Sequence, residues 1–394
     1  MNARRAALVV AVLLLAGGAA WLLLREPERP PVAARLSVAR VLDASSEAGF
    51  ARALAPRGFV FPADHGPHPG FRTEWWYFTG NLEAAGGRRF GYQLTFFRNA
   101  LAPGAVARAS HWAAREAWLA HFALTDVEGR RFHAFERFRR GALGLAGAEA
   151  RPFRVWLDRW EASGSVNSPA AAAAWGPLTL HAAAGEVALD LRLAPGKPTV
   201  LQGDSGLSRK GAAPGQASYY YSLTRMPTTG RLRLDGQDLT VRGLSWMDRE
   251  WSTSSLSPGQ VGWDWFALQL ADGRELMLYR LRLADGGIDP ASSGSLVAAD
   301  GAKRHLARRN FAVAELARWE SPAGGSYPAR WRVRVPSAEL DLEVRPLLTD
   351  QEHRGAFRYW EGAVAVEGTA AGAPVAGRGY VELTGYTEMQ KETR

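Results

Sequence analysis

Residues Trp75–Leu94 read WWYFTGNLEAAGGRRFGYQL, and a related stretch, WDWFALQLADGRELMLYRL, returns at Trp263–Leu281. In both stretches aromatic residues open an apolar-alternating run, a turn that contains glycine follows, and a second run returns. Alternation with a period of two is typical of half-buried β-strands. Each stretch is therefore predicted to form a β-hairpin, and its recurrence indicates an internal repeat.

Two further matches follow in the same order. Leu189–Gly196 (LDLRLAPG) resembles Leu340–Leu348 (LDLEVRPLL), and Tyr219–Asp248 resembles Tyr359–Tyr386. Between the two copies lies Ser252–Gly259, whose composition is that of a connector. The sequence therefore predicts two related β-domains in tandem.

The rest of the chain after residue 50 also consists of short alternating runs, and helical periodicity is almost absent. Leu232–Val241 and Leu268–Tyr279 each carry Asp-Gly between two runs, which is a hairpin signal. Spaced strands with such turns predict an all-β protein whose antiparallel sheets close as barrels or sandwiches. The predicted organisation is an N-terminal anchor or signal segment (1–24), a linker (25–50), a first β-domain (51–255) and a second β-domain (256–394).

The N-terminus carries Arg4 and Arg5 and then an uncharged run, Ala6–Leu24, of 19 residues. A helix needs about 20 such residues to span a bilayer. Gly17–Ala20 offers a cleavage site for a signal peptide, but Trp21–Leu24 continues the apolar run past it. The positive-inside rule places the two arginines in the cytoplasm. The body is therefore predicted to lie on the periplasmic side of the inner membrane, anchored by residues 6–24, with secretion after signal cleavage as the alternative.

Composition excludes several classes of protein. The chain has 394 residues, 47% of them hydrophobic, which is enough for two domains with a core. It has no cysteine, which excludes disulfides, thiolate catalysis, cysteine-ligated zinc and a lipid anchor on cysteine. The net charge is +9, but the arginines are spread singly rather than clustered, so no nucleic-acid partner is expected.

Five motifs carry a resemblance to a known family. They are FPADHGPHPGFRTEWWYFTGNL, AHFALTD, GLSWMDREWSTS, GWDWFALQL and RGYVELTGY, and the similarity runs from about Phe59 to Tyr386. The chain resembles the AttH family, which includes bacterial carotenoid 1,2-hydratases. The resemblance implies two tandem lipocalin-like antiparallel β-barrels and no cofactor.

The resemblance also implies one of two functions. Some members hydrate acyclic carotenoids, whereas others are exported proteins, described as predicted secreted hydrolases and associated with ABC transporters. The N-terminal segment favours the second group. The expected function is therefore that of an exported protein that binds an isoprenoid or another lipid and works with components of an ABC transporter. The alternatives are a cofactor-independent hydratase and a structural protein with filled barrels.

The aromatic runs predict where a ligand binds. Because successive strand residues point to opposite faces, Trp75 and Tyr77 share one face and Trp76 and Phe78 share the other. One pair is expected to line a barrel that holds the hydrophobic ligand, and the other to pack outward against the second domain. Plain core packing is the alternative. The expected ligand contacts are Glu74, Trp75, Tyr77, Trp246, Trp263 and Trp265.

The run Trp246–Trp251 (WMDREW) offers the groups that alkene hydration requires. These are a carboxyl group kept neutral by apolar surroundings, aromatic faces for the cation and a group that takes the proton from water. The carotenoid hydratases resemble this run in having an aspartate that matches Asp248, which the resemblance makes the proton donor. They tend to have His-Asn where this chain has Arg249 and Glu250. An adjacent arginine is expected to lower the pKa of Asp248, and a structural ion-pair network or polar contacts to a ligand are the alternatives.

The predicted catalytic residues are Asp248, Glu250 and His121. His121 lies at the edge of an apolar strand, where most histidines are satisfied core residues. It becomes the candidate base for water if it faces a barrel interior near Asp248. An apolar tunnel with an unpaired Asp248 favours the hydratase, whereas a tunnel in which Asp248 pairs with Arg249 favours the carrier.

The segment DHGPH places Asp64, His65 and His68 close to Glu74, and such residues suffice for zinc. Its glycine and prolines indicate a loop, which does not present both histidines on one side. We therefore expect no metal here. The loop is expected to plug a barrel mouth, with both histidines bound to the backbone.

Overall fold

The computed structural model describes residues 47–104, 115–164, 176–254 and 256–387. In these residues the chain forms β-strands and four 3-10 helices, η2 (Ala63–His65), η3 (Ala85–Gly87), η5 (Arg308–Asn310) and η6 (Pro336–Ala338). None of the helices in these ranges has the length and apolar character to cross a membrane. The predicted anchor over residues 6–24 lies outside the described residues. The all-β prediction is confirmed.

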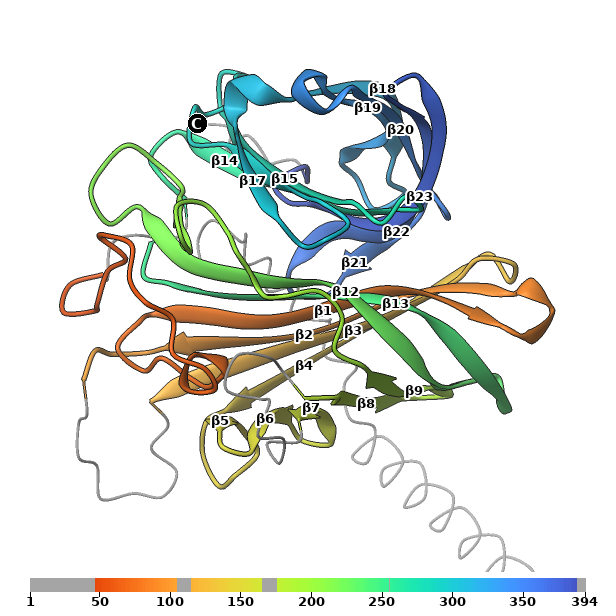
Figure 1. Ribbon diagram of the computed structural model, residues 1–394. Coiled ribbons are helices and arrows are strands. Elements are labelled where there is room, and N and C mark those ends of the chain that lie inside the picture. Colours follow the sequence, from red (N-terminus) through yellow and green to blue (C-terminus); the bar gives the residue numbers. More distant parts are fainter. Residues whose placement is uncertain (1–46, 105–114, 165–175, 255, 388–394) are drawn as a thin grey trace, which may run out of the picture. The chain divides into compact units, whose positions relative to one another are not determined.

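Thirteen strands form the first sheet, which is antiparallel throughout (Figure 1). Their spatial order is β4-β3-β2-β1-β13-β12-β9-β8-β7-β6-β5, and β10 and β11 pair with β12. The strands are β1 (Thr73–Ala84), β2 (Arg89–Ala100), β3 (Glu116–Asp126), β4 (Arg131–Arg140), β5 (Ala146–Ala150), β6 (Phe153–Leu157), β7 (Trp160–Gly164), β8 (Leu178–Ala184), β9 (Val187–Leu193), β10 (Val200–Leu201), β11 (Leu207–Arg209), β12 (Ala217–Leu234) and β13 (Gln237–Ser252).

Ten strands form the second sheet, in the order β17-β16-β15-β14-β23-β22-β20-β19-β18, with β21 paired to β22. The strands are β14 (Gln260–Leu270), β15 (Glu275–Leu283), β16 (Ser293–Val297), β17 (Lys303–Ala307), β18 (Ala312–Glu320), β19 (Ser326–Val335), β20 (Leu340–Pro346), β21 (Glu352–Arg354), β22 (Arg358–Ala370) and β23 (Ala373–Leu383).

The two sheets repeat one topology. The order β2-β1-β13-β12-β9-β8 in the first sheet becomes β15-β14-β23-β22-β20-β19 in the second, which is the order that the three sequence matches imply. The predicted hairpins also form. Asp235 and Gly236 join β12 to β13 with φ of 52° and 75°, the left-handed conformation of a tight hairpin turn. The first sheet ends at Ser252 and the second begins at Gln260, while the domain limits remain a prediction.

Neither sheet is a closed barrel. A barrel closes only when its edge strands pair. In the described residues β4 and β5 do not pair with each other, and neither do β17 and β18. The first sheet instead curls until β6 packs against β2, β3 and β4. The predicted curvature is therefore observed in the first sheet, but the prediction that the sheets close into barrels is wrong.

Strand alternation separates two cores in the way that the sequence predicts. Trp76 and Phe78 are fully buried inside the first sheet. Tyr77 points the other way and packs with Trp265 and Tyr380 of the second sheet. Burial of one such side chain contributes about 1.5–3 kcal/mol. The strands that carry the aromatic runs therefore fix the packing of sheet on sheet.

Candidate functional site

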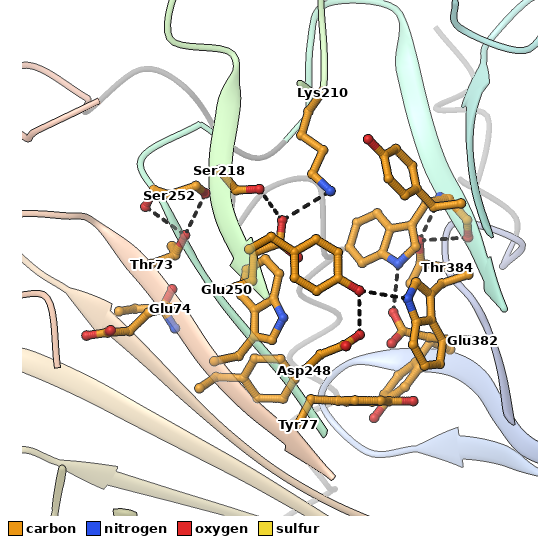
Figure 2. Close-up of a pocket in the computed structure, with 18 of the residues that line it drawn as sticks. Thr73, Glu74, Tyr77, Lys210, Ser218, Asp248, Glu250, Ser252, Glu382 and Thr384 are labelled. Atoms are coloured by element: carbon orange, nitrogen blue, oxygen red, sulfur yellow. Dashed lines mark hydrogen bonds and ion pairs between the residues drawn. The ribbon is translucent and has the colours of Figure 1, made fainter. Parts of the chain in front are cut away.

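A pocket of about 200 Å³ lies between the two sheets (Figure 2). The prediction that a ligand site lies inside a barrel is wrong, because large side chains fill the interiors of both sheets. Those of the first sheet include Trp76, Trp118, Trp160 and Trp251, and those of the second include Trp331 and Trp360. The space between the sheets is lined instead by nine aromatic side chains, with the acids Asp248, Glu250 and Glu382 among them. The nine are Trp75, Tyr77, Phe97, Tyr220, Trp263, Trp265, Tyr279, Phe357 and Tyr359.

Asp248 on β13 points into this pocket and is 3% exposed. Its carboxyl group accepts hydrogen bonds from Tyr220 Oη at 2.5 Å, Ser222 Oγ at 2.5 Å and Trp246 Nε1 at 2.7 Å. Burial raises the pKa of Asp248 to about 7, against these three hydrogen bonds, which lower it. Every donor is neutral, so nothing in this shell forces the ionised form.

Arg249 points to the opposite face of β13. Its guanidinium forms an ion pair with Glu74, donates to the carbonyl oxygen of Gly66 at 2.6 Å and lies 3.9 Å above the ring of Trp76. The expectation that Arg249 lowers the pKa of Asp248 is therefore wrong, because adjacent residues of a strand project from opposite faces. The alternative of one ion-pair network through residues 248–250 is wrong for the same reason.

Glu74, a predicted ligand contact, is fully buried and held by two arginines, Arg98 and Arg249. It also accepts hydrogen bonds from the backbone N–H of His68 at 3.0 and 3.1 Å. Burial would raise the pKa of Glu74, but the charges of both arginines outweigh it and hold the pKa well below its usual range. Glu74 borders the pocket, yet its carboxylate is committed to these partners.

Glu250 lies on the same face as Asp248, as predicted, but it has a cation of its own. Lys210 Nζ lies 3.1 Å from its carboxylate, and Ser218 donates a hydrogen bond to it. Lys210 also lies 4.0 Å above the ring of Tyr279. Burial would lower the pKa of Lys210, but the charge of Glu250 outweighs it and the pKa is raised. Glu250 is thus committed to Lys210 and Ser218.

Glu382 on β23 enters the pocket from the second sheet (Figure 2). Trp263 Nε1 donates a hydrogen bond to its Oε1 at 2.8 Å. Burial raises the pKa of Glu382 to about 7, against the bond from Trp263, and the charge of Asp248 raises it further. The buried Asp248 of the first sheet and the partly buried Glu382 of the second therefore border one pocket and interact electrostatically.

His121 lines the same pocket, but its ring nitrogens are engaged by other groups. Nδ1 lies 2.6 Å from the hydroxyl of Tyr359, and Nε2 lies 3.1 Å from a carboxylate oxygen of Glu136. The structure thus brings His121 to the pocket of Asp248 without a hydrogen bond between the two in the described contacts. The condition set for a base role, a position inside a barrel, is not met.

The predicted aromatic contacts separate into two groups. Trp75, Tyr77, Trp263 and Trp265 all line the pocket. Trp246 packs in the core between the sheets and directs its Nε1 to Asp248, so it positions the acid rather than bordering the space.

The sequence does not predict several residues of the site. Glu382, Lys210, Tyr220 and Tyr359 line the pocket, and Ser222 donates a hydrogen bond to Asp248 from outside the lining. The internal repeat carried a signal for Glu382. Asp248 is paired in register with Tyr77, and Glu382 is paired with Trp265, which occupies the same position in the second copy. Lys210 follows the short strand β11 and carries no periodic signal.

The rings of His65 and His68 contact other side chains, whereas the sequence predicts hydrogen bonds to the backbone. His65 Nδ1 lies 2.7 Å from the hydroxyl of Tyr221, and His68 Nε2 lies 3.1 Å from Asp64. Among the residues that the structure describes, no group of three or more histidines or acids has an arrangement that could hold a metal. The contacts make this loop a structural element that packs against Trp251.

Comparisons with known proteins place this geometry in context. The profile of the AttH-like family matches residues 52–386. A Nitrosomonas europaea protein described provisionally as an AttH protein is 35% identical, with a TM-score of 0.75 over 86% of this chain and 100% of its own.

Two structures are more distant. Kievitone hydratase from Nectria haematococca is 15% identical, with a TM-score of 0.66 over 86% of this chain and 97% of its own. CghA with Sch210972 is 17% identical, with a TM-score of 0.50 over 88% and 97%. These two similarities show the fold alone. A search of curated proteins found no match.

Proposed function

The chain belongs to the AttH-like family, and from this premise we propose that it is a hydro-lyase that adds water to a carbon–carbon double bond of a hydrophobic substrate. Asp248 donates the proton. The reaction needs a proton donor, a proton acceptor and a shielded cation, all of which side chains supply, so the proposal includes no cofactor.

The observation that carries the proposal is the state of Asp248. A buried carboxyl group with only neutral hydrogen-bond partners and a pKa of about 7 is still about half protonated at pH 7, so it can donate a proton there. Enzymes tune carboxylic acids to this range for general acid catalysis by the same means, an apolar site. A carrier has no need of a carboxyl group tuned in this way.

The step itself follows from the walls of the pocket. Asp248 transfers its proton to one alkene carbon, the π bond breaks, and a carbocation forms at the other carbon. The rings of Trp265 and Tyr77, whose centroids lie 5.2 Å apart in an edge-to-face arrangement, border the same space. An aromatic face contributes about 1–2 kcal/mol to a desolvated cation. Water then forms the C–O bond, loses a proton and leaves an alcohol.

The substrate class follows from the lining. Aromatic rings dominate the pocket, so an isoprenoid or another lipid fits its chemistry. A volume of about 200 Å³ suits the reacting end of such a molecule rather than a whole carotenoid. That a kievitone hydratase has the same fold supports the proposal only at the level of fold. Anchoring by residues 6–24 on the periplasmic side and work with an ABC transporter remain predictions.

The test uses the full chain in detergent with a lipid extract of the source cells, and an acyclic carotenoid as a defined probe, in ¹⁸O-labelled water. Mass spectrometry is expected to find a lipid together with its counterpart heavier by one labelled water. Asp248→Asn is expected to lower this incorporation by about 10²–10⁴-fold, whereas the exposed Glu186→Gln leaves it unchanged. Bound lipid without incorporation by the wild type would instead support the carrier. Undiminished incorporation by Asp248→Asn would remove Asp248 from the mechanism.

A further inference from the structure

Asp248 and Glu382 are counterparts in the internal repeat. Each lies on the last long strand of its sheet, β13 or β23, opposite an aromatic residue of the strand that opens the repeat, Tyr77 or Trp265. Each also accepts a hydrogen bond from a tryptophan Nε1, at 2.7 Å for Asp248 and 2.8 Å for Glu382. Packing the two repeats together brings the two acids into one pocket.

Asp248 and Glu382 both lack the cationic partner that Glu250 has. In the part of the chain that the structure describes, no ion pair involves either carboxyl group, whereas Glu250 in the same pocket pairs with Lys210. Figure 2 shows both groups away from Lys210. The charge of Asp248 raises the pKa of Glu382, and the charge of Glu250 raises it as well.

We propose that Glu382 is the group that takes the proton from the attacking water, so that the hydration works across a pair of acids, one from each repeat. This inference rests on the proposed function. Asp248 gives a proton to carbon, the water oxygen bonds to the cation, and the O–H proton of that water passes to Glu382. The pair holds one proton before and after the step. Transfer from Glu382 back to Asp248 restores the starting state with no net uptake.

Other groups that face the pair are less suited to this role. Glu361 of β22 lies opposite Glu382 in register and accepts a hydrogen bond from Tyr77, and burial raises its pKa well above the usual range, so it stays protonated. Glu250 is occupied by Lys210. Two tyrosines of the lining, Tyr220 and Tyr359, have pKa values well above the usual range because they are buried.

The chemistry of Glu382 predicts a pH profile. Turnover needs Asp248 protonated and Glu382 ionised, so the rate is expected to be bell-shaped, with an acidic limb from Glu382 and an alkaline limb from Asp248. Glu382→Gln is expected to lower the hydration rate by at least about 10²-fold and to remove the acidic limb. Formate added to this variant is expected to restore part of the rate, because a small carboxylate replaces the missing base.

The experiment compares wild type, Glu382→Gln, Asp248→Asn and the surface control Glu186→Gln in the ¹⁸O assay, with and without formate. A rate and a pH profile of Glu382→Gln equal to those of Glu186→Gln would overturn the inference and leave the role of Asp248 intact. A slow Glu382→Gln with an unchanged profile and no rescue by formate would reduce Glu382 to a structural residue.

A second measurement needs no substrate. Infrared spectroscopy of the protein with ¹³C-labelled glutamate follows the protonation of Glu382. In Asp248→Asn the pKa of Glu382 is expected to fall, because the like charge that raises it is gone. An unchanged Glu382 titration would show that the acids are not coupled and would overturn the pair even if the wild type hydrates no lipid in the extract.

Discussion

Glu74 and Asp248 lie on paired strands and are both buried, but their pKa values are shifted in opposite directions. Glu74 on β1 faces the interior of the first sheet, where Arg98 and Arg249 keep its pKa well below the usual range. Asp248 on β13 faces the pocket, where neutral donors surround it and its pKa is raised to about 7. Burial alone therefore does not decide whether an acid is charged. The presence of a cation within reach decides it.

The second sheet repeats the contrast. Asp264 on β14 is fully buried and lies 2.5 Å from Arg280 and 3.1 Å from Arg282, inside the sheet. Glu382 on β23 faces the pocket and has a pKa raised to about 7. Each repeat thus carries an arginine-held carboxylate in its interior and an acid without an arginine partner at the pocket between the sheets. The first kind stabilises the fold, and the second kind is available for chemistry.

The largest effect is expected for Glu74→Gln, which tests whether the arginine-held carboxylate stabilises the fold. The amide keeps the shape of the side chain but leaves the charges of Arg98 and Arg249 buried without their partner. Loss of one partner from a buried ion pair typically destabilises a protein by about 3–5 kcal/mol. We expect a loss of this size in the free energy of unfolding at pH 7, measured by urea titration of tryptophan fluorescence. A loss no larger than that of Glu186→Gln would show that the buried network contributes nothing net.

Asp248→Asn, in contrast to Glu74→Gln, is expected to favour the folded protein as the pH rises toward 7. In the wild type, the folded state keeps the proton on Asp248 up to a pH of about 7, whereas the unfolded state releases it near 3.8. The unfolded state therefore binds fewer protons between these values, and wild-type stability falls as the pH rises through this window. The shift corresponds to about 4 kcal/mol. The asparagine has no such dependence.

The measurement compares the free energies of unfolding of wild type and Asp248→Asn at several pH values. We expect the difference to move in favour of the variant by up to about 4 kcal/mol from about pH 4 to pH 7 and to stay constant above it. A difference that does not change with pH would mean that Asp248 is ionised in the folded protein at neutral pH. That result would also remove the basis for its role as an acid.

The sequence predicts much of the fold because its signals are local. Alternation in Trp75–Leu94, the turn at Asp235 and Gly236 and the order of the matches give the strands, the hairpins and the repeat. Whether the sheets close into barrels and where the pocket lies depend on long-range strand pairing and on which side large side chains fill. No local sequence pattern encodes these properties. Alternation separates Trp76 from Tyr77, but it does not say which side is filled by large side chains and which side leaves space.

The site is predictable to the extent that strand parity determines it. Parity places Asp248 and Glu250 on one face and Arg249 on the other. The predicted effect of Arg249 on the pKa of Asp248 is wrong because these neighbours in sequence project from opposite faces of β13 and do not meet in space. Tyr220 meets Asp248 within the β12–β13 hairpin, but the register shifts between Leu223 and Met226, so counting from the turn does not pair these residues correctly. Lys210 follows the short strand β11, and a single sequence does not reveal that it reaches the pocket.

The smallest effect is predicted for a hydrogen bond to Asp248, and it tests whether neutral donors tune the pKa of this acid. Tyr220→Phe removes one neutral donor from Asp248 without adding a charge. The bond from Tyr220 favours the ionised form, so its loss is expected to raise the pKa of Asp248 further, by less than one unit, because a hydrogen bond contributes about 1 kcal/mol. Infrared titration with ¹³C-labelled aspartate measures this shift. Tyr219→Phe is the matched control, because the hydroxyl of Tyr219 donates to the carbonyl oxygen of Ala55 instead. If Tyr220→Phe lowers the pKa of Asp248, or moves it no more than Tyr219→Phe does, then hydrogen bonds from neutral donors do not tune this acid. The arginines around Glu74 alone would then distinguish the two buried acids.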